Sequence, residues 1–297
     1  MDDLQMTAPA SAAEPTRRRY YVVRRFLRNR GAVAGAIGFL LIVSVAIAAP
    51  WLARHDPVRQ SLRTALQPPS ATYFLGTDQF GRDIYSRLVY GARISLRVGL
   101  VSVGIALIFG TPLGLVAGYY RGRVDALVSR LVDVVLSFPA VLLALAIMAV
   151  LGPSLTNAMI AVGISILPQY VRVSRASTLS VADLDYIVAA RAIGANDLTI
   201  VVRHVLPNIA LPIVVLTSLQ MASAVLFAAS LSFLGLGAQP PTPEWGAMLT
   251  TGRTYMRDAW WIPVFPGLAI TLTVLSLNLL GDGLRDALDP RHARTES

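Results

Sequence analysis

A polar segment at residues 185–208 carries the residue types best suited to holding another protein. Two small residues, Ala189 and Ala190, precede Gly194 by five and four positions. Glycine adopts backbone conformations that are closed to other residues, so Gly194 predicts a sharp turn between two short helices. Alanine side chains beside such a turn let a second surface approach closely. We therefore expect a helical elbow that docks a partner; bracing the membrane helices from below is the alternative.

Capping residues indicate where the two helices of the elbow begin. Ser180 and Asp183 fit the S-x-x-D pattern of a capping box, which predicts a first helix that runs to about residue 193. Asn196 is a favourable cap for the second helix. Three hydrogen-bond donors and a closing pair complete the segment: Arg191, Arg203, His204, Leu206 and Pro207.

The remaining sequence is strongly apolar, which places the elbow in a membrane protein. The chain of 297 residues is 55% hydrophobic and only 14% charged, whereas soluble domains carry about 25% charged residues. Its apolar residues are grouped in blocks of about 20, the length of a transmembrane helix. We identify six membrane spans. Their approximate bounds are 32–52, 95–119, 124–151, 155–171, 209–234 and 262–284.

The arginines predict the orientation of these spans. All 26 basic residues are arginine, and 17 of them fall on the side of the membrane that holds the N-terminus. Basic residues concentrate on the cytoplasmic side, so both termini and the elbow are expected there, in a multi-pass protein of the cell membrane. Tryptophan prefers the membrane interface. All four tryptophans fall at the expected outer interface: Trp51, Trp245, Trp260 and Trp261.

The predicted organisation is a tail, a first span, a large loop, a core and a second tail. The basic N-terminal tail occupies 1–31, and its first 16 residues are expected to be disordered. The first helix is 32–54 and the external loop 55–92. A core of five spans follows at 93–285, with the elbow at 180–207, and a cytoplasmic tail ends the chain at 286–297.

Several kinds of chemistry are excluded by missing residues. The chain has no cysteine, which excludes disulfides and thiolate metal sites. It has no lysine, and a conventional phosphate-binding P-loop requires one. Its three histidines are scattered, at His55, His204 and His292. We expect no catalytic residues, no metal, no cofactor and no nucleic-acid partner, since arginines beside membrane spans account for the positive charge.

Polar and small residues inside the spans predict helix contacts or a route for a solute. Gln220 falls near the middle of the fifth span and Asn278 in the inner half of the sixth. Such side chains face the interior of a bundle or a wet cavity, so they line a route or bond neighbouring helices. Gly110, Gly114 and Gly118 form a doubled G-x-x-x-G, which predicts close packing of two helices.

The long loop before the second span carries charged and turn-forming residues together. Asp78, Arg82 and Asp83 lie among Gly76 and Gly81. Long loops with structure of their own tend to be functional. We expect an ordered cap that receives an external protein or gates the channel mouth. The alternative is that the three charged residues only fold the loop against the helices.

The elbow resembles the E-A-A-x3-G-x9-I-x-L-P signature of permease subunits in binding-protein-dependent ABC importers. Two positions depart from it, with Val188 in place of Glu and His204 in place of Ile. In that family the elbow inserts into a groove on a cytoplasmic ATPase and transmits its closure to the membrane helices. Five residues match in register: Ala189, Ala190, Gly194, Leu206 and Pro207.

Further stretches are similar to the dipeptide, oligopeptide and nickel branch of these permeases. Residues 75–87 read L-G-T-D-Q-F-G-R-D-I-Y-S-R, residues 232–237 read S-F-L-G-L-G, and residues 278–286 read N-L-L-G-D-G-L-R-D. The resemblance covers almost the whole chain beyond residue 20. It implies an all-α membrane protein with the type I, methionine-importer-like permease fold and one extra N-terminal helix.

The resemblance also implies partners and a transported solute. The partners are a second homologous permease, two cytoplasmic ABC ATPase subunits and an extracytoplasmic substrate-binding protein. Di- or oligopeptides are the expected solute, with nickel or glutathione as the alternative. An ATP-independent secondary transporter and a scaffold without transport activity are the competing classes; many secondary transporters show inverted repeats, and this sequence shows none.

Overall fold

The computed structural model describes residues 23–288, and the predicted tails 1–31 and 286–297 therefore lie largely outside the described residues. The described chain is all-helical apart from one isolated β-bridge. Its main elements are α2 Arg30–Leu52, η1 Leu62–Thr64, α3 Ile84–Tyr120, α4 Gly122–Leu136, α5 Ala140–Leu151, α6 Leu155–Ala182, α7 Asp185–Ala192, α8 Asp197–Thr199, η2 Ile200–Val205, α9 Leu206–Phe233, α10 Trp245–Arg253 and α11 Trp261–Leu288.

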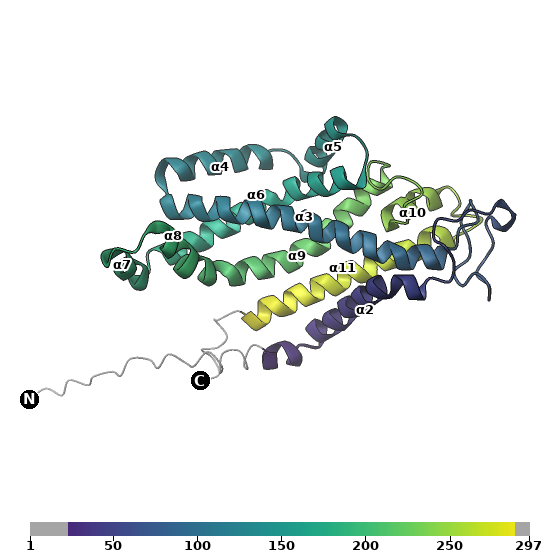
Figure 1. Cartoon of the computed structure of the whole chain (residues 1–297), viewed down its shortest axis with the longest axis horizontal. Helices are drawn as coiled ribbons and strands as arrows, with labels where there is room; N and C mark the ends of the chain where they lie inside the picture. Colours follow the sequence, from purple (N-terminus) through teal and green to yellow (C-terminus); the bar gives the residue numbers. More distant parts are fainter. Residues whose placement is uncertain (1–22, 289–297) are drawn as a thin grey trace, which may run out of the picture.

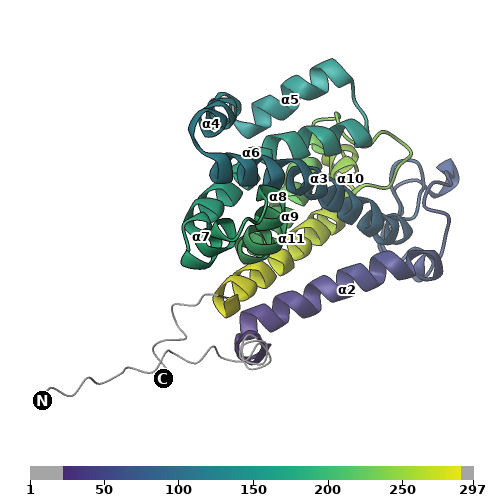
Figure 2. The ribbon, with the colours of Figure 1, turned by 60° about the vertical axis from the view of Figure 1, so that its left-hand side comes forward.

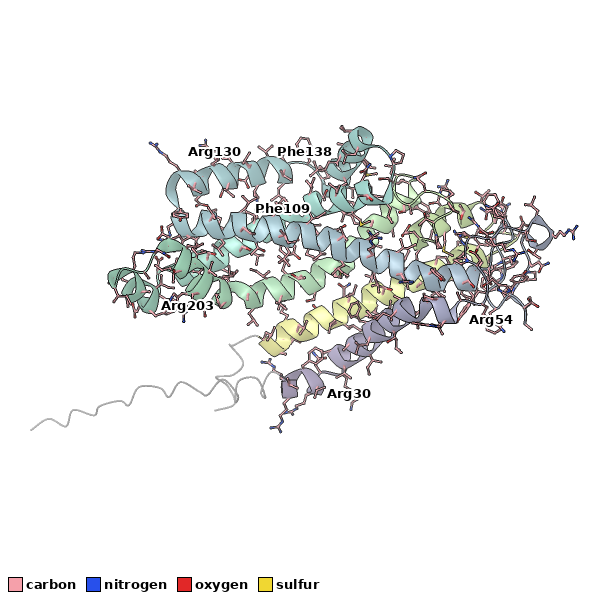
Figure 3. The ribbon with its side chains drawn as sticks, viewed as in Figure 1. Arg30, Arg54, Phe109, Arg130, Phe138 and Arg203 are labelled. Atoms are coloured by element: carbon pink, nitrogen blue, oxygen red, sulfur yellow. The ribbon has the colours of Figure 1, made fainter. Side chains whose placement is uncertain are left out.

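The molecule is elongated and has two distinct ends (Figure 1). We call the end that carries α7 and α8 the elbow end, and the end that carries the loop 53–83 the loop end. Arg203 lies at the elbow end and Arg54 at the loop end (Figure 3). The long helices run between the two ends, so several of them connect the elbow end with the loop end.

Short polar side chains cap the N-termini of three long helices. Asn29 accepts a hydrogen bond from the Ala32 amide at the start of α2. Asp83 does the same for the Ser86 amide at the start of α3, and Ser154 for the Asn157 amide at the start of α6. Each cap satisfies one of the backbone donors that a helix start leaves unpaired.

Helices α3 and α6 pack most closely, and the doubled G-x-x-x-G of α3 is the reason. A β-carbon added at Gly110 would lie 2.7 Å from Tyr170 Cβ. One added at Gly114 would lie 2.3 Å from the Val171 carbonyl oxygen. The prediction that these glycines serve close helix packing is confirmed, because the two backbones approach too closely for any side chain.

The predicted span 124–151 is divided into two helices, α4 and α5. The chain bends by 87° between α4 and α5, at a break that contains Ser137, Phe138 and Pro139. Proline has no backbone N–H and disfavours helical conformation in the residue before it, which accounts for the break. Both helices lie in a layer over α3 and α6 (Figure 2), and Phe138 stands exposed at the corner (Figure 3).

The N-terminal helix α2 packs against α11 through small residues. A β-carbon at Gly35 would lie 2.6 Å from the Leu280 amide nitrogen, and one at Gly38 would lie 2.3 Å from Ser276 Oγ. The opposite face of α2 exposes large apolar side chains, as expected of a surface that contacts lipid. These side chains are Ile37, Leu40, Leu41 and Ile47.

Four described helices are long and apolar enough to cross a membrane, or five if the bent pair α4–α5 is counted as one span. They are α2, α3, α11 and the continuous helix Asp197–Phe233. Two helices extend beyond the predicted spans: α3 begins at Ile84, 11 residues before 95–119, and α6 continues past 155–171 to Ala182. Helix α6 carries Gln169, Arg172 and Arg175, which make it the most polar of the long helices.

Candidate functional site

The elbow is a short helix, a left-handed glycine and a second helix that continues into α9. Gly194 has φ = +87°, which favours glycine over every other residue. The Ala195 amide donates to the Ala190 carbonyl and the Gly194 amide to the Arg191 carbonyl. This Schellman pattern closes α7, as the sequence predicted. Asn196 then caps the next helix by accepting from the Thr199 amide, which was also predicted.

The predicted start of the elbow is wrong. Ser180 lies inside α6, where its hydroxyl donates to the Ser177 carbonyl, and α7 begins only at Asp185 without a side-chain cap. Serine bonds readily to its own helix backbone, so the S-x-x-D pattern alone does not define a helix start. We use the name elbow below for residues 183–205.

One face of the elbow belongs to the protein core. Ile187, Ile200 and Val205 are completely buried, and Ala190 is buried as well. They join the same apolar cluster as Tyr119 of α3. The predicted alanine pair is therefore divided: Ala190 packs inward, and only Ala189 lies on the exposed face.

The opposite face of the elbow exposes large apolar side chains. Ile193 is 86% exposed and Leu198 is 73% exposed. Nothing lies within 4 Å of the position that a β-carbon on Gly194 would occupy. Sequence reasoning missed this face, although apolar residues at these positions of a polar segment were the available signal. Other exposed large apolar side chains of the elbow are Leu184, Tyr186, Val188 and Val202.

Tyr119, at the end of α3, ties both arms of the elbow to the membrane helices. Its hydroxyl donates to Asp197 of α8 at 2.8 Å and accepts from Arg191 of α7 at 3.4 Å. The hydrogen bond with Tyr119 also raises the pKa of Arg191 above its ordinary value. Arg191 is thus a link in the elbow, a role that the sequence did not predict.

The last predicted members of the elbow lead directly into α9. Leu206 and Pro207 form the first turn of α9 and are exposed. Proline suits this position because the first helical turn does not need its missing N–H. Arg203 is exposed and His204 half-buried in η2, and the His204 ring lies 6.4 Å from the Tyr186 ring. Because α8 and η2 run into α9 without a break, the second arm of the elbow and α9 form one continuous helix.

Exposed ion pairs connect the helices around the elbow end. Arg121 bonds Asp183 at 2.6 Å, and both side chains are largely exposed. Arg172 of α6 bonds Asp133 of α4 at 2.8 Å, again between exposed groups. Exposed pairs contribute only about 0–1 kcal/mol each, so they orient the elbow end without fixing it.

Gln220 and Asn278 are not brought together at one site. Gln220 is buried in α9 and donates a hydrogen bond to Gln169 of α6. Tyr170 and Thr217 make a second bond between the same two helices. Asn278 is exposed on α11. Gln220 therefore bonds a neighbouring helix, one of the two roles that its sequence position allowed.

The loop end holds a buried ion pair at the predicted charged residues. Asp78 is 2% exposed and Arg82 is 3% exposed, and their side chains bond at 2.6 Å. Asp78 also accepts from the Phe80 and Arg82 amides, both at 2.9 Å. Asp83 is buried as the cap of α3. The three side chains fold the loop against the helices, and only neighbouring residues face outward.

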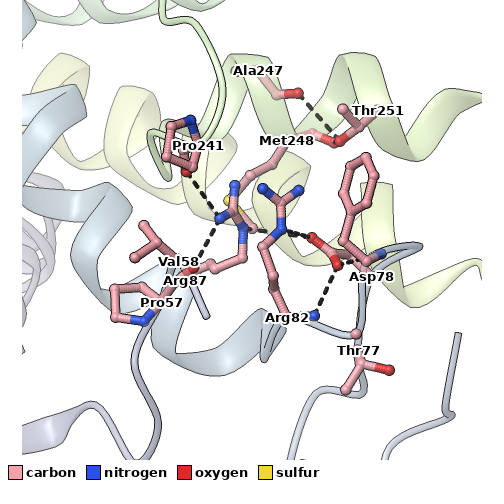
Figure 4. A network of polar contacts seen from close by, with 12 residues as sticks. Pro57, Val58, Thr77, Asp78, Arg82, Arg87, Pro241, Ala247, Met248 and Thr251 are labelled. Carbon is pink, nitrogen blue, oxygen red and sulfur yellow. Dashed lines mark hydrogen bonds and ion pairs between the residues drawn. The ribbon is translucent and has the colours of Figure 1, made fainter. Parts of the chain in front are cut away.

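Arg87 joins three separate segments at the loop end (Figure 4). Its Nη1 donates to the Pro57 carbonyl at 2.9 Å and to the Pro241 carbonyl at 3.2 Å, and its Nε lies 3.8 Å from Asp78. It thus links α3, the loop 53–83 and the loop before α10. Sequence reasoning quoted Arg87 within the L-G-T-D-Q-F-G-R-D-I-Y-S-R stretch but assigned it no role.

Two buried tryptophans donate hydrogen bonds to backbone carbonyls at the loop end. Trp261 donates to the Thr77 carbonyl at 3.1 Å, and Trp245 donates to the Leu88 carbonyl at 2.9 Å. Both are buried, whereas Trp51 and Trp260 are exposed. Glu244 is also buried and accepts from the Gly246 and Ala247 amides; burial raises its pKa above the ordinary value.

The described residues contain no group of three or more His, Cys, Asp or Glu that could hold a metal ion. The described chain is all-helical, has four or five helices that could cross a membrane, and carries an elbow with exposed apolar side chains at one end. Two family profiles match it: the binding-protein-dependent transport system inner membrane component over residues 110–294, and the N-terminal transmembrane domain of oligopeptide transport permease C over residues 19–69.

The chain belongs to the binding-protein-dependent transport system inner membrane components, the permease subunits of ABC importers. It is 50% identical over 272 residues to the di/tripeptide transport system permease protein DppC of Pseudomonas aeruginosa, covering 90% of each chain. It is 48% identical over 269 residues to the glutathione transport system permease protein GsiD of Pectobacterium atrosepticum, covering 90% of this chain and 89% of the other.

A solved structure supports the same fold. A chain of the MetNI methionine ABC transporter, in an inward-facing conformation, matches with a TM-score of 0.55 at 20% identity. The match covers 68% of this chain and 96% of that chain. At this identity the likeness concerns the fold alone, and it agrees with the predicted methionine-importer-like core.

Proposed function

We propose that this chain is one half of the membrane channel of an ATP-driven importer for di- or oligopeptides. The observation that carries the proposal is the elbow of a permease-family chain, with an exposed apolar face around Gly194 and a rigid connection into α9. The named relatives support peptides as the solute. Glutathione, itself a small peptide, is the second candidate because of the relative GsiD.

The proposed orientation puts the elbow end and both termini in the cytoplasm and the loop end outside. The arginine distribution supports it, since 17 of 26 basic residues fall at the proposed inner side. The proposal counts six spans, with α4–α5 as one bent span and α6 as another. Buried polar residues of α6, such as Ser174 and Thr178, face its neighbours rather than lipid.

In the proposed mechanism, closure of the ATPase pair moves the elbow, and the elbow moves the membrane helices as a rigid body. Three connections described above would transmit the movement. The second arm of the elbow and α9 are one continuous helix, Tyr119 joins the elbow to α3, and Gln220 joins α9 to α6. ATP shifts the balance of inward- and outward-facing states because it binds one ATPase arrangement more tightly. The chain itself catalyses no reaction.

The proposed complex contains a second permease, two ATPase subunits and an external binding protein. The exposed part of the cap at residues 68–72 is the proposed contact for the binding protein, because Asp78, Arg82 and Asp83 are buried beneath it. Replacing residues 69–72 with a Gly-Ser linker should impair delivery by the binding protein and spare basal ATP hydrolysis. Wild-type delivery would exclude the tip from docking.

The orientation can be tested with single cysteines, since the chain has none of its own. A cysteine at Asp197 should react with a membrane-impermeant maleimide only after permeabilisation, and one at Ser70 should react in intact cells. The reverse pattern would invert the topology. Uptake by energised vesicles that contain no ATP would instead indicate an ATP-independent transporter.

A further inference from the structure

A groove with two arginines runs between α2 and α3. Its volume is about 440 Å³, and Met221 of α9 also lines it. Phe39, Val43 and Ile47 of α2 line one wall. Leu100, Arg93 and Arg97 belong to the opposite wall on α3, so the guanidinium groups are its only charged components.

Arg93 and Arg97 lack partners within residues 23–288. Neither makes a hydrogen bond, an ion pair or a cation–π contact with the described residues, and both are exposed. They are four positions apart on one helix, which puts them on the same face. Arg82 and Arg87, only a few residues earlier on the chain, are by contrast buried and bonded to other residues of the loop end.

The groove lies at membrane depth, in the half nearer the loop end. Helix α2 has 23 residues, about 34 Å at 1.5 Å per residue, close to the hydrocarbon thickness of about 30 Å. Val43 and Ile47 stand eight and four positions before the exposed Trp51, or about 12 and 6 Å along the helix. Long arginine side chains at this depth extend toward the headgroups.

We propose that this groove binds an anionic phospholipid of the leaflet at the loop end. The phosphate would lie between the Arg93 and Arg97 guanidinium groups, which suit paired hydrogen bonds to phosphate oxygens. An acyl chain would follow Phe39 and Val43 along α2. The groove continues onto the exposed apolar face of α2, which favours a lipid over a hydrated peptide. The proposal does not depend on the solute.

The test uses the assembled importer, purified in detergent and exchanged into mixed micelles that contain phosphatidylglycerol. Native mass spectrometry counts the phosphatidylglycerol molecules retained per complex. The double variant Arg93→Gln with Arg97→Gln should bind this lipid about tenfold more weakly, since bonds to charged groups are the strong ones. The double lysine variant should restore much of the binding. Arg257→Gln, an exposed arginine outside the groove, is the matched control and should bind like wild type.

A second measurement tests for lipid in the groove without replacing the arginines. A cysteine at Leu100 carrying a photoreactive group should label phosphatidylglycerol in liposomes. Equal lipid retention by the double glutamine variant and the Arg257→Gln control would overturn the proposal. Labelling of the second permease subunit in place of lipid would overturn it too, because the arginines would then pair with acidic groups of that subunit.

Discussion

The two ends of this molecule use charge in opposite ways. At the loop end, Asp78 and Arg82 are buried and bonded at 2.6 Å, with Arg87 completing the network. At the elbow end, Arg121 and Asp183 bond at the same distance, but both remain largely exposed. Equal distances therefore describe very different interactions, because the surroundings decide what an ion pair contributes.

The glycines of the two ends differ in the same way. Gly76 and Gly81 have left-handed φ values, and a β-carbon at either would lie within 3 Å of other atoms. Gly194 is left-handed as well, but it faces open space. Both ends expose large apolar side chains, but the left-handed glycines of the loop end are covered by this chain, whereas the turn at Gly194 is open. We propose that a partner covers this open turn.

The largest expected effect follows from breaking the buried ion pair. Asp78→Ala would leave Arg82 and Arg87 buried without their carboxylate, which costs about 3–5 kcal/mol. The melting temperature of the purified complex, followed by tryptophan fluorescence, should fall clearly. Arg121→Ala removes an exposed pair worth about 0–1 kcal/mol and should change melting little. Equal effects of the two substitutions would contradict the contrast between the ends.

Strain at the elbow should abolish transport without preventing membrane insertion. Gly194→Val puts a branched side chain at φ = +87°, where a left-handed conformation costs about 1–2 kcal/mol, and it closes the open turn. ATP-driven uptake of a labelled dipeptide should be lost. Gly152→Val is the matched control, since Gly152 has φ = +83° and equally open space but lies between α5 and α6. If both variants lose uptake equally, the elbow has no special role.

Loss of the Tyr119 hydroxyl should weaken coupling rather than folding. Tyr119→Phe removes the hydrogen bonds to Asp197 and Arg191. Their loss lowers the free energy of unfolding by about 1 kcal/mol. We expect uptake to fall several-fold while the reconstituted complex keeps its basal ATP hydrolysis. Tyr120→Phe changes an exposed neighbouring ring and should leave both rates unchanged. A parallel decline of uptake and hydrolysis would point to misfolding instead.

The smallest expected effect concerns Gln220. Gln220→Leu replaces one hydrogen bond between membrane helices by apolar contact, and such bonds are worth about 0.6 kcal/mol on average. Melting and the KM for the dipeptide should stay near wild-type values. A large change in KM with unchanged melting would show that Gln220 contacts the solute, which is the alternative role that its position in the sequence allowed.

Features set by local backbone chemistry were predictable from the sequence. The turn at Gly194, the cap at Asn196 and the packing role of Gly110 and Gly114 all follow from what those residues can and cannot do. Local chemistry also explains why the predicted helix start at Ser180 was wrong. A serine hydroxyl can bond its own helix instead of capping the next one, and the sequence pattern is identical in both cases.

Features set by contacts between distant segments were not predictable. Tyr119 and Asp197 are 78 positions apart, and Arg87 and Pro241 are 154 apart. No local pattern links such residues. Proline at residue 139 favours a kink in the predicted span 124–151, but no local pattern predicted a bend as large as 87°.

The central claim, that the exposed face of the elbow docks the ATPase, is tested most directly by copurification. Ile193→Asp puts a charge on the most exposed large side chain of the elbow. Burial of such a side chain contributes about 1.5–3 kcal/mol, so the ATPase retained by the tagged permease pair should fall about tenfold or more. Leu62→Asp, at a similarly exposed residue of the loop end, should retain the ATPase fully. Equal retention by both variants would contradict the account.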